Sequence, residues 1–281
     1  MALISVIISL ILDHAFRHKH HLRDLSWFER YSQKVLSYIK TDNGWIRLVA
    51  VLAAPLLLVT LLQLILFNIF WGLLFFLLGI PVLFYCLGPD SMINDIDAYL
   101  DARSLGDDDE ALHYAYVLTG SSASSAPDQQ TNDVTRAILN TANERVFSVL
   151  FWFALLGPLG AALYRLTTDL CKQGSATESL QKAASLLHAS MAWAPARLLA
   201  IGYALTGHFD GAVHAYHNRP TEEDITLANY DILVHTGLGA LHGQEGTDEI
   251  SCIRSARGLV TRSILIWIAV LALLTLGGLL G

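Results

Sequence analysis

The residues between Arg145 and Arg165, which are 146–164, carry no charge. As an α-helix they would span roughly 28 Å, close to the ~30 Å hydrocarbon core of a bilayer, and the two arginines could snorkel to the headgroup layers. Gly157-Pro158 lies inside this run, and the missing N–H of proline predicts a kink or a break in the helix. A broken helix is tolerated at membrane depth where it is buried in protein or lines a cavity. The stretch is therefore both a predicted membrane span and a candidate site.

The composition supports a membrane protein, because 53% of the residues are hydrophobic and only 15% are charged. A net charge of −7 argues against nucleic acid as a partner. The three cysteines are far apart and form no CxxC pair, which argues against a disulfide framework or a zinc site. Walker A, GxSxG, HExxH and GxGxxG motifs do not occur, so we expect no cofactor.

The sequence predicts an all-α polytopic membrane protein, one domain over residues 1–281, with four or five membrane helices and a helical cytoplasmic lobe. Residues 48–87 are uncharged and about twice as long as one crossing requires, so they predict a hairpin of two helices that turns around 63–72. The predicted segments are N-terminal apolar and amphipathic helices (1–45), the transmembrane hairpin (46–87), acidic cytoplasmic helices (88–145), a signature helix pair (146–206), further cytoplasmic helices (207–263) and a C-terminal transmembrane helix (264–281).

The basic flanks predict the orientation, because cytoplasmic segments carry the excess of lysine and arginine. The basic segment 13–45 and the arginines before residue 264 place the main polar segments in the cytoplasm. This arrangement needs an even number of crossings between 146 and 206, so 146–164 and 186–206 either both cross or both fail to cross.

Local signals predict several helix ends and contacts. The acidic run that begins at Asp107 should cap a helix over 110–118, and Gly120 should end it. Pro220-Thr221-Glu222-Glu223 is typical of a helix start. Gly237-Leu238-Gly239-Ala240 predicts close packing between helices rather than a phosphate loop.

Three groups of polar residues could bind a metal, and each has a simpler interpretation. The candidates are His14, His18, His20 and His21; His208, Asp210, His214 and His217; and Asp90, Asp95, Asp97 and Asp101. The first group lies in a basic segment that suits a membrane surface, and the acidic group follows one helix face that suits solvent. We favour these simpler interpretations and predict no metal site.

A sharper set of polar residues lies at or within the apolar helices, where such residues mark functional sites more often than charges on solvent faces do. Arg197 would be costly inside a lipid-facing helix, by about 2.5–3.5 kcal/mol. The arginines could clamp a phosphate or carboxylate, with Glu144 as a partner of one of them. The alternative is that they are snorkelling anchors and a structural ion pair. The candidate ligand-binding residues are Asn143, Glu144, Arg145, Tyr164, Arg165 and Arg197.

The segment NERVFSVLFWFALLGPLGAALYRL resembles the corresponding segment of the AmpE family, as do the N-terminal ISLILDHAF and the later PARL. Its signature residues are Gly157, Pro158, Gly160 and Pro195. The resemblance implies a polytopic inner-membrane protein of Gram-negative bacteria. Members of the family are encoded beside the amidase that recycles anhydro-muropeptides, and they are associated with control of β-lactamase induction.

AmpE proteins in turn resemble the CobD/CbiB enzymes, which join aminopropanol or its phosphate to adenosylcobyric acid. The apolar motifs of that family match here at 150–152, 157–161, 164–165 and 195–198. The polar residues of that family do not match. Phe147-Ser148 stands near the position of its Asp-Gly, and His188 and Ala192 stand at the positions of its carboxylates and asparagine.

These departures favour a regulator of cell-wall-stress or β-lactamase-induction signalling over an enzyme. The alternative is an amide-forming enzyme that acts on a membrane-proximal anionic substrate near Arg165 and Arg197. A third hypothesis is a transport accessory protein. The expected partners are the lipid bilayer and either an anionic small molecule, such as a cell-wall fragment, or a signalling protein, and a homo-oligomer is compatible with the sequence.

Overall fold

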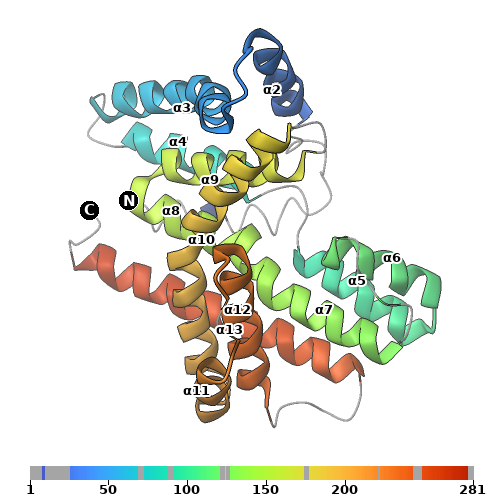
Figure 1. Cartoon of the computed structure of the whole chain (residues 1–281). Helices are drawn as coiled ribbons and strands as arrows, with labels where there is room; N and C mark the ends of the chain where they lie inside the picture. Colours follow the sequence, from blue (N-terminus) through green and yellow to red (C-terminus); the bar gives the residue numbers. More distant parts are fainter. Residues whose placement is uncertain are drawn as a thin grey trace. The chain divides into compact units, whose positions relative to one another are not determined.

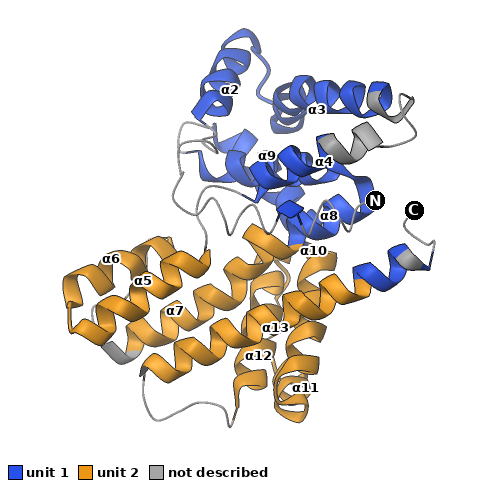
Figure 2. Cartoon of the chain, turned by 180° about the vertical axis from the view of Figure 1, so that it is seen from behind, with its two compact units in different colours: residues 1–89, 148–192, 271–281 blue, residues 90–147, 193–270 orange. Residues whose placement is uncertain are grey.

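The computed structural model describes residues 8–9, 26–68, 73–87, 92–120, 124, 127–173, 177–220, 222–242 and 249–277, and every regular element in these ranges is a helix (Figure 1). The predicted all-α class is therefore confirmed. The chain divides into two compact units (Figure 2). Unit 1 contains residues 1–89, 148–192 and 271–281, and unit 2 contains residues 90–147 and 193–270.

Unit 1 is built around α9 (Pro158–Lys172), which packs against α3 (Gly44–Asn68), α4 (Leu73–Cys86) and α8 (Ser148–Leu156). α2 (Ser26–Tyr38) covers α3, and the first part of α10 (Glu178–Thr206) completes the unit. Its core includes Phe28, Val51, Leu170 and Leu180, all fully buried. The amphipathic helix predicted on the basic segment is confirmed over the range of α2.

Unit 2 contains α5 (Met92–Leu105), α6 (Asp108–Thr119), α7 (Pro127–Ala142), α11 (Phe209–His217), α12 (Ile225–Leu241) and most of α13 (Glu249–Leu276). A π-helical turn, Asn143–Phe147, follows α7. The buried phenol of Tyr203 on α10 donates a hydrogen bond to the backbone oxygen of Leu139 on α7, at 2.8 Å. This bond satisfies the one polar atom of the side chain inside an otherwise apolar core.

The glycine-rich segment of α12 packs closely against its neighbours, as the sequence predicts. A Cβ atom built on Gly239 would lie 2.4 Å from the backbone oxygen of Gly211 on α11, and one built on Gly211 would lie 2.4 Å from the oxygen of Gly239. A Cβ on Gly237 would meet the side chain of Leu139 at 2.7 Å. Glycine is thus required for the approach of α11 to α12.

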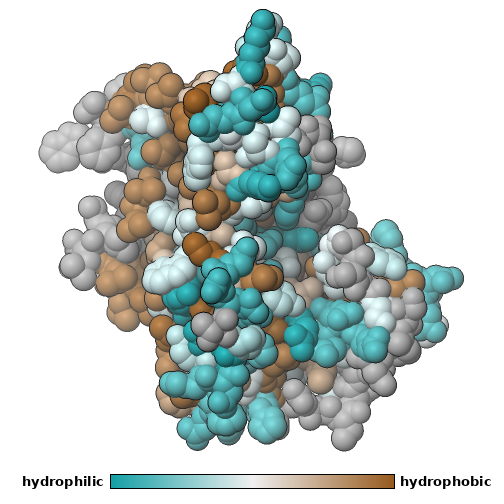
Figure 3. Space-filling view, in the orientation of Figure 1, coloured by the Kyte–Doolittle hydropathy of each residue, from teal (hydrophilic) through white to brown (hydrophobic). Residues whose placement is uncertain are grey.

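Two of the described helices are long and apolar enough to cross a membrane, over Gly44–Ile65 of α3 and Ile250–Thr275 of α13. Leu57 and Leu61 of α3 remain 60% and 57% exposed, and apolar residues gather on the α3 side of Figure 3. These features fit a membrane protein. The predicted hairpin corresponds to α3 and α4, although α4 has only 14 residues. The predicted C-terminal transmembrane segment, 264–281, overlaps α13, which begins at Glu249 and is a candidate span over Ile250–Thr275.

The predicted ends of α6 are confirmed. Asp107 caps the helix by accepting a hydrogen bond from the backbone nitrogen of Glu110 at 3.0 Å. Gly120 ends it with a left-handed backbone, at φ 81°. The apolar start of the predicted segment 1–45, except residues 8–9, lies outside the described residues, as does the cluster of His14, His18, His20 and His21.

α12 begins at Ile225, later than the Pro220–Glu223 signal predicts, because Asp224 is the capping residue. Its carboxylate accepts hydrogen bonds from the backbone nitrogens of Thr226 at 2.6 Å and Leu227 at 3.3 Å. These bonds lower the pKa of Asp224. The cap therefore contributes stability that is complete above the ordinary aspartate pKa of about 3.9 and is lost as the pH falls through the lower folded value.

We expect Asp224→Ala to lower the thermal unfolding midpoint at pH 7, with a difference from wild type that shrinks as the pH falls below the ordinary aspartate pKa of about 3.9. Asp224→Asn keeps an acceptor oxygen and should unfold close to wild type at pH 7, with a weaker dependence on pH. Circular dichroism in detergent micelles at several pH values measures both effects. An Asp224→Ala midpoint equal to that of wild type at neutral pH would contradict the capping role.

Candidate functional site

The predicted break at Gly157-Pro158 is confirmed. α8 ends at Leu156, Gly157 adopts φ 68° and ψ −154°, and Pro158 begins α9. Gly160 then lies against the end of α8, since a Cβ atom there would be 2.3 Å from the backbone oxygen of Trp152. The signature glycines and proline thus fold α9 back closely along α8.

The second signature proline, Pro195, does not interrupt its helix. α10 runs continuously from Glu178 to Thr206 with Pro195 inside it. Because proline has no N–H, the backbone oxygen of Met191 loses its intrahelical donor. The indole Nε1 of Trp152 on α8 donates to that oxygen at 3.0 Å. A side chain from another helix therefore replaces the missing backbone bond, which explains why the helix continues.

This replacement predicts coupling between Trp152 and Pro195. Trp152→Phe should lower the free energy of unfolding by about 1–3 kcal/mol, because a buried carbonyl loses the indole donor that replaces its intrahelical one. In a Pro195→Ala background the new N–H can bond to Met191, so the same substitution should cost about 1 kcal/mol less. A double-mutant cycle in mixed micelles measures the coupling, and a cycle with additive single effects would contradict this account.

Asn143, Glu144 and Arg145 form the first three residues of the π-helical turn. Arg145 does not pair with Glu144 here. Its Nη1 lies 3.2 Å from a carboxylate oxygen of Asp95 on α5, and both side chains are 17% exposed. Glu144 accepts a hydrogen bond from the side-chain amide of Asn140 at 3.4 Å. Arg145 is therefore not the arginine partner expected for Glu144, and a pairing of Glu144 with another arginine stays a prediction.

The predicted acidic face on α5 also makes ion pairs. Arg257 of α13 pairs with Asp97 at 2.7 Å, and Arg145 pairs with Asp95 two residues earlier on α5. A solvated helix face is therefore wrong as a description of Asp95, which is largely buried between helices. These two pairs tie α5 to the π-helical turn and to α13 within unit 2.

The histidines of α11 each use a ring nitrogen in a local contact. His208 caps the helix by accepting from the backbone nitrogen of Gly211 at 2.9 Å, and His217 donates from Nδ1 to the backbone oxygen of Val213 at 2.9 Å. The ring of His214 contacts the amide of Asn218. In the part of the chain that the structure describes, no group of three or more His, Cys, Asp or Glu residues has the arrangement of a metal site.

Tyr164 and Arg165 lie on α9 in unit 1. Tyr164 is fully buried, with its ring centroid 5.2 Å from that of His188 on α10. Arg165 lines a cavity of about 610 Å³ between α2, α3, α4 and α9. Asp169, one turn further on α9, accepts a hydrogen bond from Gln173 at 2.9 Å. Burial raises the pKa of this carboxyl, although the bond from Gln173 opposes the shift.

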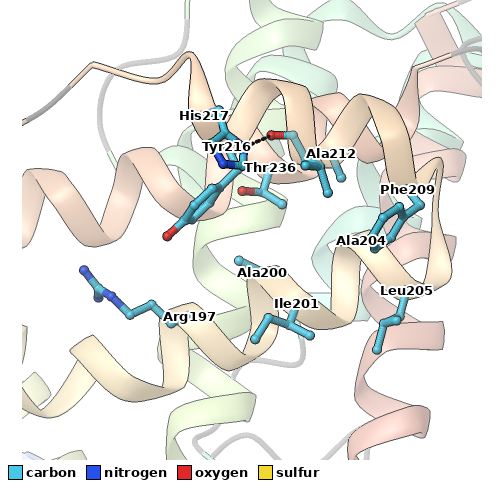
Figure 4. A pocket seen from close by; sticks show the side chains of 11 residues that line it. Arg197, Ala200, Ile201, Ala204, Leu205, Phe209, Ala212, Tyr216, His217 and Thr236 are labelled. Carbon is cyan, nitrogen blue, oxygen red and sulfur yellow. Dashed lines mark hydrogen bonds between the residues drawn. The ribbon is translucent and has the colours of Figure 1, made fainter.

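Arg197 lies at one end of a second cavity, a groove of about 310 Å³ formed by α10, α11 and α12 (Figure 4). Its Nη1 donates to the backbone oxygen of Trp193 at 2.9 Å and to Asn229 at 3.2 Å. The guanidinium also stacks on the Trp193 ring, 4.0 Å from the centroid, which is a cation–π contact. Among the described residues no carboxylate lies within ion-pair distance of Arg197.

The groove has a polar end and an apolar end. Figure 4 shows Tyr216 at the same end as Arg197, while Leu205 and Phe209 lie at the other end. The groove thus combines positive charge with apolar walls, which suits an anion that also carries apolar groups.

Thr236 of α12 contributes a hydroxyl to this groove. The residue is 3% exposed, and its Oγ1 has no hydrogen-bond partner among the described residues. Leaving such a group unsatisfied costs about 1–3 kcal/mol, so its presence calls for an explanation. Sequence reasoning missed Thr236 and Tyr216, because nothing in their local pattern distinguishes them from ordinary helix residues.

The structure divides the six predicted site residues between its units. Tyr164 and Arg165 belong to unit 1, and the other four belong to unit 2. Within unit 2, Arg145 makes an ion pair with Asp95 and Arg197 lines the groove, so they occupy different settings. A shared ligand site for all six stays a prediction.

Comparison with known proteins gives the family. A family model described as "Regulatory signalling modulator protein AmpE" matches residues 1–281. Protein AmpE of Shigella flexneri is 23% identical over 288 residues, which cover 99% of both chains. Two cobalamin biosynthesis proteins CobD match shorter parts. That of Stutzerimonas stutzeri (strain A1501) is 31% identical over 111 residues, 38% of this chain and 36% of its own.

The CobD of Chromobacterium violaceum is 38% identical over 76 residues, which cover 26% of this chain and 24% of the relative. No solved structure matches the chain. The family model, in contrast to these partial matches, covers the whole chain from residue 1 to residue 281. The chain therefore belongs to the AmpE family of regulatory signalling modulators.

Proposed function

We propose that this protein is an inner-membrane regulator that links cell-wall recycling to β-lactamase induction, and that the groove beside Arg197 binds its signal. The signal would be an anionic small molecule with apolar groups, such as a cell-wall fragment. The description of the family as a regulatory signalling modulator supports the regulatory part. The link to β-lactamase and the cell wall comes from the resemblance at 143–166.

The observation that carries the proposal is the composition of the groove. Arg197 has no described carboxylate as a partner, and the buried Thr236 hydroxyl has no hydrogen-bond partner among the described residues. A bound carboxylate or phosphate could accept hydrogen bonds from both the guanidinium and the hydroxyl. Leu205 and Phe209 would cover the apolar part of the ligand.

The sharpest test is Thr236→Val, which removes the hydroxyl and keeps the shape of the side chain. Because the hydroxyl has no partner in the described structure, the variant should accumulate and unfold like wild type or slightly better. We expect β-lactamase induction in a complemented deletion strain to fall several-fold, which corresponds to about 1 kcal/mol of lost ligand binding.

Arg197→Ala should reduce induction further, by about tenfold or more, since a hydrogen bond to a charged group contributes about 1.5–3 kcal/mol. Thr119→Val and Arg254→Ala are matched controls in unit 2, because neither residue lines the groove. Normal induction by both groove variants, at wild-type protein levels, would sink the assignment of the groove.

We also propose a multi-pass topology with four or five membrane helices and cytoplasmic polar segments. The two long apolar helices support at least part of it, and the basic flank before 264 supports the cytoplasmic side of α13. Cysteine labelling from each side of the membrane, at exposed positions such as Ser37 and Glu222, tests it. Labelling of these positions from the periplasmic side would contradict the orientation.

A second candidate function is a CobD-like amide-forming enzyme. The partial matches to two CobD proteins favour it, whereas the missing carboxylates near 143–148 and 188–192 do not. Complementation of a strain that lacks the cobalamin synthase discriminates the two functions, because growth without supplement would require the enzymatic activity.

A further inference from the structure

The larger cavity in unit 1 is almost entirely apolar and lies against a candidate membrane helix. Its volume of about 610 Å³ falls in the range of pockets that hold small molecules. Pro55 and Leu58 of α3 and Pro81 of α4 contribute to its walls, with Trp27 of α2. Leu58 is 60% exposed, so the cavity opens onto the apolar outer surface of α3. A ligand could therefore enter it from the hydrocarbon of a bilayer.

Arg165 is the charged residue of this cavity. Its Nε is buried and has no hydrogen-bond partner among the described residues. No described carboxylate lies within ion-pair distance of its guanidinium; the carboxyl of Asp169 bonds to Gln173 and interacts with Arg165 only through charge at longer range. A cation in an apolar setting is costly unless an anion compensates it. The cavity thus supplies one cationic group and a long apolar wall.

An amphiphile with one anionic head and an acyl chain satisfies both features. Its headgroup oxygens would accept hydrogen bonds from Arg165, and its chain would cover the apolar walls. α3 passes the length and composition test for a membrane span, which makes the bilayer itself the nearest source of such molecules.

We propose that this cavity is a binding site for an anionic membrane lipid, with the phosphate at Arg165 and an acyl chain between α3, α4 and α9. The site is separate from the groove in unit 2, and the proposal goes beyond the signalling function. It is tested by lipid binding alone, so its failure and the failure of the proposed function are distinguishable.

Trp27 lies in the cavity wall and provides a local reporter. The protein is reconstituted in phosphatidylcholine nanodiscs that contain increasing fractions of brominated phosphatidylglycerol or brominated phosphatidylcholine, because bromine quenches tryptophan fluorescence at short range. The Trp27 component is the difference between wild type and Trp27→Phe. We expect the anionic lipid to quench it at an about tenfold lower mole fraction than the neutral lipid.

Arg165→Gln should bring this ratio to about one, whereas Arg165→Lys should keep most of it. Arg30→Gln is the matched control, because Arg30 is an exposed arginine on α2 of the same unit and does not line the cavity. Its ratio should equal that of wild type. Ala54→Phe, at an exposed position of the cavity wall, should weaken quenching by both lipids without affecting folding.

Three results would overturn the proposal. The first is an equal response to the two lipids in wild type, and the second is a preference that survives in Arg165→Gln. The third is loss of the preference in millimolar inorganic phosphate but not in chloride of equal ionic strength, which would assign the site to a free anion. Native mass spectrometry of the same variants provides a second readout, and retention of phosphatidylglycerol by wild type and Arg165→Lys alone would support the lipid site.

Discussion

Gly157→Ala is expected to lower the free energy of unfolding by about 1–3 kcal/mol, or to prevent folding of α8 against α9. Gly157 adopts φ 68° and ψ −154°, a backbone conformation that is essentially restricted to glycine. Any side chain there strains the connection that turns α9 back along α8. Unfolding by SDS titration in mixed micelles measures the loss, with helical circular dichroism as the signal.

Gly258→Ala is the control for this substitution. Gly258 lies inside α13, and a Cβ atom there would meet nothing within 4 Å. The same change of residue should therefore leave stability unchanged or raise it by about 0.4–1 kcal/mol. If Gly157→Ala were as stable as Gly258→Ala, the backbone at Gly157 would not be constrained as described.

Gly239→Ala is expected to cost a similar amount, about 1–3 kcal/mol, for a different reason. The new Cβ would lie 2.4 Å from the backbone oxygen of Gly211 and 2.7 Å from the Cβ of Ala215, so α11 and α12 must move apart. Because the first of these atoms belongs to the backbone, a side-chain rotation cannot relieve the clash. The effect should also reach the groove, since α11 and α12 form two of its walls.

The reciprocal clash at Gly211 gives this prediction an internal check. Gly211→Ala alone should separate the same helices, and the double substitution should cost less than the sum of the two single losses, because the second methyl enters a gap that the first has opened. Independent, additive losses would show that the two glycines act on different contacts. Thr236→Val is the control, because it changes the groove without moving α11 or α12. A loss of ligand binding in this variant therefore does not come from separation of the helices.

Features that depend on local chemistry could be predicted from the sequence. Asp107 and Gly120 bound α6 because an N-cap acceptor and a left-handed glycine act within one helical turn. The break at Gly157-Pro158 follows from the missing N–H of proline and the freedom of glycine. The close approach of α11 to Gly239 likewise follows from the small size of glycine, which has no side chain.

Features that depend on distant partners could not be predicted. The donor that lets α10 continue through Pro195 comes from Trp152, and the ion-pair partner of Arg145 is Asp95, fifty residues away along the chain. The sequence pattern marks Arg197 as costly but says nothing of the Thr236 hydroxyl beside the same groove. Each of these needs the three-dimensional packing of helices that local patterns do not encode.

The bond from Trp152 to Met191 has a consequence for how α8 and α10 are aligned. In the interior of an ordinary helix, every backbone carbonyl already accepts a hydrogen bond from the helix itself. No single carbonyl is then distinguished as the acceptor for a neighbouring indole. Pro195 makes one carbonyl different from all the others, and the Trp152 indole can be satisfied only at that height and that rotation of the helix. The proline thus encodes a unique sliding and rotational position of one helix against another, much as a polar residue fixes the alignment of a coiled coil.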